Sequence, residues 1–329
     1  MNDQNKHHFF TENLLHWHAS HHRPLPWKGE RNPYLIWLSE IILQQTRVEQ
    51  GLPYFEKFKR KYPTVQDLAA APEDEVMKLW EGLGYYSRAR NLHAAAKFIA
   101  HDLGGIFPNT FESIRSLKGV GDYTASAIAS FAFDLPFAVV DGNVYRVLAR
   151  FFGIDEAVDT TAGKRIFAEL AQALLDKSQP GKYNQAIMDF GATHCTPAAP
   201  KCPTCPLRPE CVAFQTGSVA VFPVKSKKLE RRTRFFNYLI FNQQDCIFLK
   251  KRTGKDIWQN LYDFPLIETE GLVEDKNELL ENPILQAWLG GASAKLLTVS
   301  QPFRQELSHQ KIIARFLEIE IGNDFSAAG

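Results

Sequence analysis

Two segments of helical length are joined by the stretch Leu117-Lys118-Gly119-Val120-Gly121, and Tyr123-Thr124-Ala125 follows it. Glycine permits positive φ angles and close approach to the backbone, so amide groups exposed in this turn could bind a phosphate. A G-x-G turn is weak evidence alone, because a plain connection between helices has the same pattern. The stretch predicts two helices joined by a tight hairpin.

An acidic residue follows the hairpin by about twenty residues. The run Val139-Val140-Asp141-Gly142-Asn143-Val144 places Asp141 after apolar residues and at the expected N-cap of another helix. A capping aspartate is the plain structural interpretation. A functional one stays open, because the residue comes soon after the hairpin.

The same helical pattern extends outward from these two motifs. From residue 32 to about residue 213, amphipathic segments of helical length alternate with short Gly or Pro punctuation, which predicts an all-α domain. Asn32-Pro33 predicts the start of a helix that carries Glu40 and runs through Gln44 to Val48. Further helices are expected over residues 54–61, 74–80, 87–101, 123–131 and 142–152.

Composition changes after Ala213. Residues 224–234 hold six basic side chains against one glutamate, which predicts a solvated linker whose contact with phosphates is left open: Lys225, Lys227, Lys228, Arg231, Arg232 and Arg234. Strand-like runs over residues 235–241, 246–249, 295–299 and 312–321, with a helical run over 274–289, predict a small α+β domain.

Composition limits the classes of function. The chain has 329 residues, 45% of them apolar, enough for about two domains. Neither a signal-peptide pattern nor an apolar run of about 18 residues occurs, so we expect a soluble cytoplasmic protein without membrane contact. The net charge of +1 excludes a single basic field, and any nucleic-acid affinity must come from local patches.

Four of the five cysteines form one loop. Cys195, Cys202, Cys205 and Cys211 follow a C-x6-C-x2-C-x5-C spacing, with prolines at 197, 200, 203, 206 and 209 that oppose helix and sheet. Four thiolates suit a [4Fe-4S] cluster or zinc, and the spacing alone leaves both open. The fifth, Cys246, is expected to be a buried small residue.

Together, these motifs resemble the MutY-type adenine DNA glycosylases of the helix-hairpin-helix base-excision superfamily. The resemblance covers residues 10–213 and is carried by residues 37–46, 80–86, 117–125 and 140–144. It implies an all-α helix-hairpin-helix glycosylase at residues 1–213, with a six-helix barrel module at about 25–135. An iron-sulfur module of residues 1–24 and 136–213 would complete it, since the cysteine spacing equals that family's [4Fe-4S] loop.

The resemblance also assigns roles. Glu40 is the expected acid that protonates adenine N7, which requires a pKa raised by apolar neighbours. Asp141 is the expected carboxylate that stabilises the positive sugar, with Asn143 and Tyr123 as hydrogen-bonding supports. Superfamily members that nick the backbone carry Lys at position 123, so this chain is expected to leave an abasic site.

Contacts with DNA follow from the same resemblance. A buried base must be everted and the gap filled, and Gln45 and Tyr85 are expected beside the lesion. The expected partner is duplex DNA with an A:8-oxoguanine or A:G mispair, bound by a monomer associated with the nucleoid. The adenine pocket is expected to contain Arg23, Leu25 and Trp27, and the hairpin glycines Gly119 and Gly121 are expected at the DNA backbone.

After a linker at 214–232, residues 233–329 are expected to form a Nudix-like domain that recognises 8-oxoguanine. The metal-binding G-x5-E-x7-R-E-x2-E-E run of Nudix hydrolases is missing, which predicts a reader rather than a second enzyme. Residues 305–309 resemble the family's F-S-H loop, with Ser308 as the candidate contact and Leu307 in place of the usual Phe.

Two other functions stay open on this reasoning. One is a thymine glycosylase for T:G mispairs, which belongs to the same superfamily but generally lacks the trailing domain. The other is a catalytically silent iron-sulfur protein that binds DNA, which would tolerate neutral residues at positions 40 and 141. Both carboxylates are present.

Overall fold

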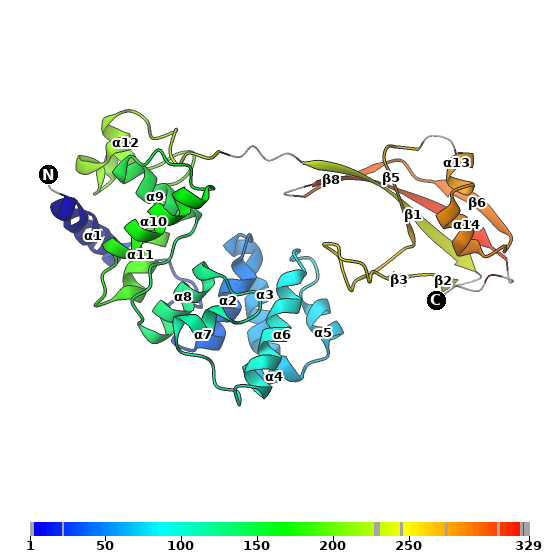
Figure 1. The fold of residues 1–329 in the computed structure, drawn as a ribbon, viewed down its shortest axis with the longest axis horizontal. Coiled ribbons are helices and arrows are strands. Elements are labelled where there is room, and N and C mark those ends of the chain that lie inside the picture. Colours follow the sequence, from blue (N-terminus) through cyan, green and yellow to red (C-terminus); the bar gives the residue numbers. More distant parts are fainter. Residues whose placement is uncertain are drawn as a thin grey trace. The chain divides into compact units, whose positions relative to one another are not determined.

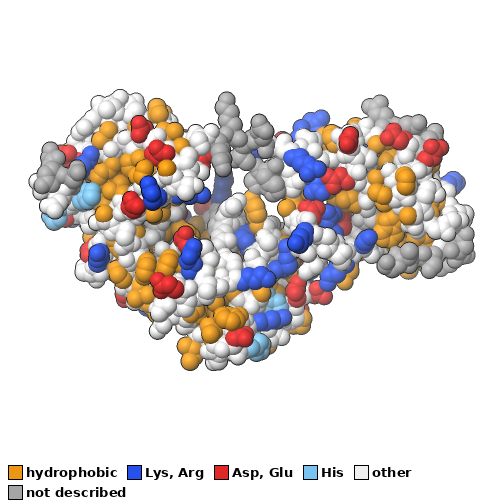
Figure 2. Space-filling view, viewed as in Figure 1, with side chains coloured by type: hydrophobic (Ala, Val, Ile, Leu, Met, Phe, Trp, Pro, Cys, Tyr) orange, Lys and Arg blue, Asp and Glu red, His pale blue; other side chains and the backbone are white. Residues whose placement is uncertain are grey.

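The computed structural model describes residues 3–21, 23–226, 231–243, 246–273, 276–307, 310–322 and 325. The chain divides into two compact units, residues 1–227 and 228–329 (Figure 1). In the described ranges, no helix is both long and apolar enough to cross a membrane. Acidic and basic side chains are interspersed on the visible face in Figure 2, consistent with the small net charge.

The described part of the first unit is built from helices. They are α1 (Asp3–Ser20), α2 (Pro33–Leu43), α3 (Val48–Lys61), α4 (Val65–Ala70), α5 (Glu73–Leu79), α6 (Ser87–His101), α7 (Phe111–Arg115), α8 (Asp122–Phe133), α9 (Gly142–Phe152), α10 (Thr161–Leu174), α11 (Pro180–Thr193) and α12 (Val212–Gln215). The helices predicted over 87–101 and 142–152 are confirmed at both ends.

Helix α2 begins as its sequence predicts, because the Asn32 side chain accepts a hydrogen bond from the Tyr34 amide and Pro33 occupies the first turn. Its end was predicted wrongly. The helix stops at Leu43 instead of continuing to Val48, where α3 begins, since Gln45 adopts a positive φ of 52°. Every residue from Tyr34 to Ile42 is buried, so α2 is a central helix of this unit.

The predicted hairpin lies between α7 and α8. Gly119 has φ +82°, and a β-carbon there would lie 2.7 Å from Asn91 Cβ, so the turn requires glycine at this position. Gly121 differs from the expectation. Its φ of −99° is open to any residue, and it serves as the N-cap of α8 with no atom within 4 Å of an added β-carbon.

A second helical core joins the N-terminus to the middle of the chain. Helix α1 packs against α10 and α11, and Phe10, Leu14 and Trp17 share one buried cluster with Phe167 and Phe190. Helix α2, in turn, packs against α3 and α8. Short 3-10 turns at Cys202–Thr204 and Arg208–Glu210 form the cysteine loop, in keeping with its prolines.

The second unit contains a mixed sheet. Its described elements are β1 (Arg232–Gln243), β2 (Cys246–Ile247), β3 (Lys250–Lys251), β4 (Tyr262–Asp263), β5 (Leu266–Thr269), α13 (Lys276–Leu280), α14 (Pro283–Leu289), β6 (Ala294–Val299), β7 (Phe303–Glu306) and β8 (Gln310–Ile321). The central pair β1 and β8 is parallel, whereas β2 and β5 pair antiparallel with β1. Strands β6 and β7 pair antiparallel with β8, and β3 and β4 form a separate ribbon.

Three expectations for this unit need correction. The single helix expected over 274–289 is two helices, because Asn282 caps a new helix that starts at Pro283. Cys246 is exposed on β2 rather than buried. Arg234 belongs to β1 instead of a solvated linker. Its Nη2 lies 2.7 Å from Glu268 Oε2, so an ion pair within the unit compensates the charge of this arginine.

Candidate active site

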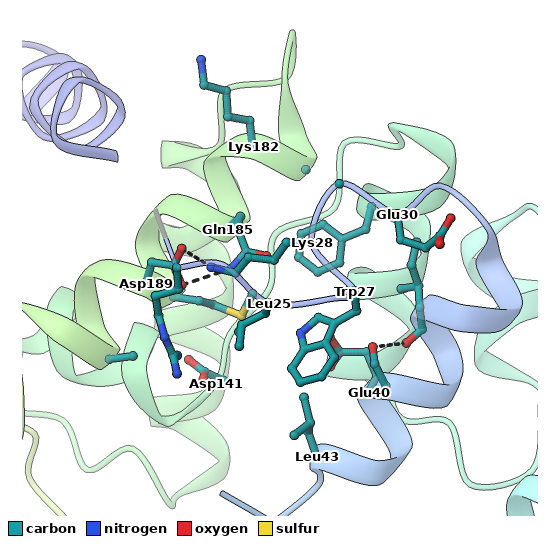
Figure 3. A pocket seen from close by; sticks show the side chains of 18 of the residues that line it. Leu25, Trp27, Lys28, Glu30, Glu40, Leu43, Asp141, Lys182, Gln185 and Asp189 are labelled. Carbon is teal, nitrogen blue, oxygen red and sulfur yellow. Dashed lines mark hydrogen bonds and ion pairs between the residues drawn. The ribbon is translucent and has the colours of Figure 1, made fainter. Parts of the chain in front are cut away.

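One cavity of about 960 Å³ lies within the first unit. Its walls come from α2, α8, the start of α9, α11 and the loop that follows α1. Figure 3 shows Glu40 and Asp141 on two sides of it, with Leu25 and Trp27 between them in this view. The structure therefore brings residues 101 positions apart into one space (141 minus 40).

Glu40 projects from the buried helix α2 into this cavity. The residue is 8% exposed, and burial raises its pKa from 4.5 to about 7. A hydrogen bond with Tyr123 opposes the rise, whereas the nearby Asp141 adds to it. A carboxyl group with a pKa near 7 can keep its proton at neutral pH and donate it.

Asp141 occupies the N-cap of α9, as its sequence context predicts. Its Oδ1 accepts hydrogen bonds from the amides of Asn143 (2.9 Å) and Val144 (2.8 Å), and its Oδ2 accepts one from Asn143 Nδ2 (2.7 Å). Burial raises its pKa, and these donors oppose the rise. Three donors and a helix N-terminus favour the carboxylate form of Asp141 and so oppose the effect of burial.

Tyr123 and Asn143 line the same cavity. The Tyr123 hydroxyl also lies 3.8 Å from Met188 Sδ, and burial raises its pKa well above the ordinary value, so it stays protonated. Asn143 Oδ1 accepts a hydrogen bond from Arg146 Nη2 at 2.9 Å, which fixes the amide in the orientation that donates to Asp141.

Arg23, Leu25 and Trp27 line the cavity from the loop after α1. Trp27 packs edge-on against Phe55, with 5.3 Å between the ring centroids, so contact with Phe55 holds this indole in place.

Sequence reasoning missed an ion pair in the same wall. Lys28 Nζ lies 2.5 Å from Asp189 Oδ2, and His18 Nε2 lies 3.3 Å from that oxygen. Lys28 directly follows the predicted pocket residue Trp27, which is a signal that could have identified it. Asp189 had no such signal, because only the packing of α11 brings it to the cavity.

Four of the expected DNA contacts are not among the residues that line the cavity: Gln45, Tyr85, Gly119 and Gly121. Gln45 is exposed at the end of α2, and Tyr85 is 39% exposed before α6. Both adopt left-handed backbone conformations, with φ 52° and 48°. Gly119 and Gly121 lie in the hairpin before α8. Ser308 lies outside the described residues.

The four loop cysteines are free thiols, each partly buried. Cys195, Cys205 and Cys211 pack against the core shared by α1 and α9–α11. Arg150 Nη1 donates to Cys195 Sγ at 3.4 Å. In the described part of the chain, no His, Cys, Asp and Glu side chains group closely enough to hold a metal ion. The donor set itself, four unpaired thiols in one proline-rich loop, fits an iron-sulfur cluster.

We predict that Glu40→Gln stabilises the protein in a pH-dependent way. The folded state holds the Glu40 proton to about pH 7, whereas the unfolded chain releases it near pH 4.5, so folding becomes less favourable as pH rises between these values. Glutamine avoids this cost. Above pH 7 the variant should gain about 3 kcal/mol of unfolding free energy, whereas below pH 4 it should gain nothing from this source. Urea denaturation across the pH range measures it, and a pH-independent difference would contradict the burial of a titrating Glu40.

Comparison with known proteins identifies relatives of this chain. Residues 38–173 match the HhH-GPD superfamily of base excision DNA repair proteins. An adenine DNA glycosylase of Buchnera aphidicola subsp. Baizongia pistaciae is 34% identical over 309 residues, 91% of this chain and 83% of the relative. The human adenine DNA glycosylase is 45% identical over 215 residues, 63% of this chain and 39% of that protein.

Solved structures agree on the fold. The structure of a thermostable thymine-DNA glycosylase is similar with a TM-score of 0.61 and 30% identity, covering 66% of this chain and 100% of the other. An endonuclease III in a DNA complex has a TM-score of 0.57 at 23% identity, covering 66% of this chain and 98% of the other, and this likeness concerns the fold alone. The helix-hairpin-helix glycosylase fold predicted from the sequence is thereby confirmed.

Proposed function

The chain belongs to the adenine DNA glycosylase family, and we propose that it everts adenine mispaired with 8-oxoguanine or guanine and hydrolyses its glycosidic bond. The observation that carries this proposal is the pairing of two carboxyl groups with different environments in one cavity. Glu40 is buried, has a hydrogen bond with Tyr123 and has a pKa of about 7, whereas Asp141 accepts three hydrogen bonds.

Cleavage of an N-glycosidic bond leaves positive charge on the sugar and negative charge on the base. In the proposed mechanism Glu40 gives its proton to adenine N7, which turns the base into a neutral leaving group. Asp141 stabilises the cationic sugar on the other side. Glu40, now a carboxylate, then accepts a proton from the attacking water. Tyr123 and Asn143 hold the two carboxyl groups, and Arg23, Leu25 and Trp27 surround the base.

We further propose that the enzyme leaves an abasic site and an intact backbone. Strand cleavage through a Schiff base needs an amine that attacks the sugar carbon. Position 123 carries a phenol that is protonated and buried, which supplies no such nucleophile. Lys28, which lines the cavity, is paired with Asp189.

The cysteine loop is proposed to hold a [4Fe-4S] cluster that stabilises its irregular backbone and supplies no catalytic step. Cys202→Ser should therefore lose bound iron, about four atoms per chain, and unfold at a temperature several degrees lower. Iron and sulfide assays with a thermal melt measure this. Cys246→Ser is the matched control, because that exposed thiol lies on β2 of the second unit. The absence of iron from both the purified wild-type protein and Cys246→Ser would contradict the proposal.

The second unit is proposed to be a Nudix-like reader of 8-oxoguanine, with Ser308 as the contact. What supports this is a mixed sheet with two helices in the described residues, attached to a glycosylase unit. We also propose that the protein acts as a monomer on nucleoid DNA.

The test is incubation of purified protein with duplexes that contain A:8-oxoguanine, A:G or T:G pairs, followed by alkali to cleave abasic sites. Cleavage at adenine, fastest opposite 8-oxoguanine, and an intact strand before alkali are expected. The thymine-DNA glycosylase likeness makes T:G the informative alternative. Cleavage mainly at thymine would replace the proposal with thymine glycosylase activity. Cleavage of none of the three duplexes would favour the catalytically silent DNA-binding protein.

A further inference from the structure

Arg88 is a buried cation that lies between two loops. It occupies the first turn of α6 and is 8% exposed. Among the described residues no carboxylate forms an ion pair with it, although burial of a charge is costly without compensating partners. Backbone carbonyl groups supply the compensation instead.

One nitrogen of the guanidinium binds the end of α2. Arg88 Nη1 donates to the carbonyl oxygens of Ile41 (3.1 Å), Ile42 (2.8 Å) and Gln44 (2.5 Å), and lies 3.2 Å from Thr46 Oγ1. The last carbonyls of a helix have no partner within it and form the negative end of its dipole. Arg88 therefore caps α2 at the point where the chain turns into Gln45.

The other nitrogen binds the loop before α6. Arg88 Nη2 donates to the carbonyl oxygens of Leu83 (3.4 Å) and Gly84 (3.1 Å). The guanidinium also lies over the rings of Trp80 and Tyr85, 5.0 and 5.5 Å from their centroids. A single planar fork thus contacts both segments at once, which a point charge such as lysine does less well.

The bonded carbonyls precede the two strained residues. Gln44 comes directly before Gln45, and Gly84 comes directly before Tyr85. Left-handed conformations of non-glycine residues are unfavourable and persist where surrounding contacts determine them. Arg88 therefore binds the carbonyl oxygen of the peptide in front of each of these residues.

We propose that Arg88 is a positioning residue that locks Gln45 and Tyr85 into one wedge, so that the enzyme can evert its target base. The proposal rests on the proposed function, because a wedge is needed only by a protein that extrudes a base. Arg88 itself touches neither the base nor the carboxyl groups in this assignment. Its loss should impair eversion and leave the chemical step intact.

The experiment compares single-turnover adenine release from two duplexes. In one, adenine is paired with 8-oxoguanine; in the other, it faces an abasic-site analogue and is more easily unstacked. Arg88→Lys should slow release from the paired duplex about tenfold and from the unpaired one less than about threefold. Its pH–rate profile should match that of wild type, because Glu40 is unchanged.

Two further variants keep the result interpretable. Ile99→Ala, which creates a cavity on the same helix α6, is the matched control for lost stability and should leave the ratio of the two rates unchanged. Thr46→Val removes the hydroxyl that accepts from Arg88 and donates to the Gln44 carbonyl oxygen, and so weakens the same junction. It should move the ratio in the same direction by about twofold even where Arg88→Lys fails to fold.

An unchanged ratio in folded Arg88→Lys or Thr46→Val, which means equal losses on both duplexes, would overturn the proposal. If the wild-type protein released adenine from neither duplex, the proposed function would be refuted. That outcome is distinct from a failure of the Arg88 proposal alone. Fluorescence of 2-aminopurine at the target position gives a second readout. Binding by Arg88→Lys should raise it less than binding by wild type, and an equal rise would count against the wedge.

Discussion

Asp141→Asn should release adenine about a thousandfold more slowly than wild type, or not at all, while binding DNA with nearly unchanged affinity. The variant loses the negative charge opposite the cationic sugar, and a thousandfold corresponds to about 4 kcal/mol of transition-state stabilisation. Asparagine is as good an N-cap as aspartate, so α9 should still form. Single-turnover release and fluorescence anisotropy with an A:8-oxoguanine duplex measure the two quantities.

The matched control for this variant is Asp155→Asn, which removes the same charge at an exposed position of the same unit. It should release adenine at the wild-type rate. Full turnover by Asp141→Asn, or an equal loss in both variants, would show that the carboxylate of Asp141 is not the group that stabilises the sugar.

Glu40→Gln should slow adenine release by about 10²–10⁴-fold at pH 6, because glutamine keeps the shape of the side chain but cannot transfer a proton. The wild-type rate should fall as pH rises through about 7, since burial sets the pKa of Glu40 there and only the protonated form is the acid. The variant's residual rate should lack this fall. A series of single-turnover rates across pH checks both statements.

A contrary result is easy to recognise. A wild-type rate that is flat between pH 6 and pH 8, or a variant that keeps the wild-type profile, would assign the proton to another group. Because the same substitution is expected to increase stability above pH 7, loss of activity together with a gain in stability would distinguish this site from a damaged fold.

Much of the fold follows from local signals. Asn32-Pro33 starts α2, and Asp141 caps α9, because capping depends on the side chain and the two or three amides that follow it. Gly119 was expected to allow a positive φ and does, at a point where Asn91 leaves no space for a β-carbon. These are local rules, and a sequence displays them directly.

Long-range packing accounts for the rest. Glu40 was expected to be buried from its apolar neighbours, but the contact of Asp189 with Lys28 depends on how α11 meets the loop after α1. No local sequence signal marks Arg88 in its predicted helix. Its burial is explained only by the ends of two other segments, whose carbonyl oxygens it binds. Arg234 was placed in a linker because its partners lie more than twenty residues away.

A crystal structure of Asp141→Asn bound to a duplex with an A:8-oxoguanine pair tests the account most directly. We expect the adenine outside the helix and inside the cavity, with N7 within hydrogen-bonding distance of Glu40 and the sugar C1′ facing the side chain at position 141. An adenine that stays stacked, or that is everted into a site without Glu40, would contradict the assignment of these two residues to one reaction.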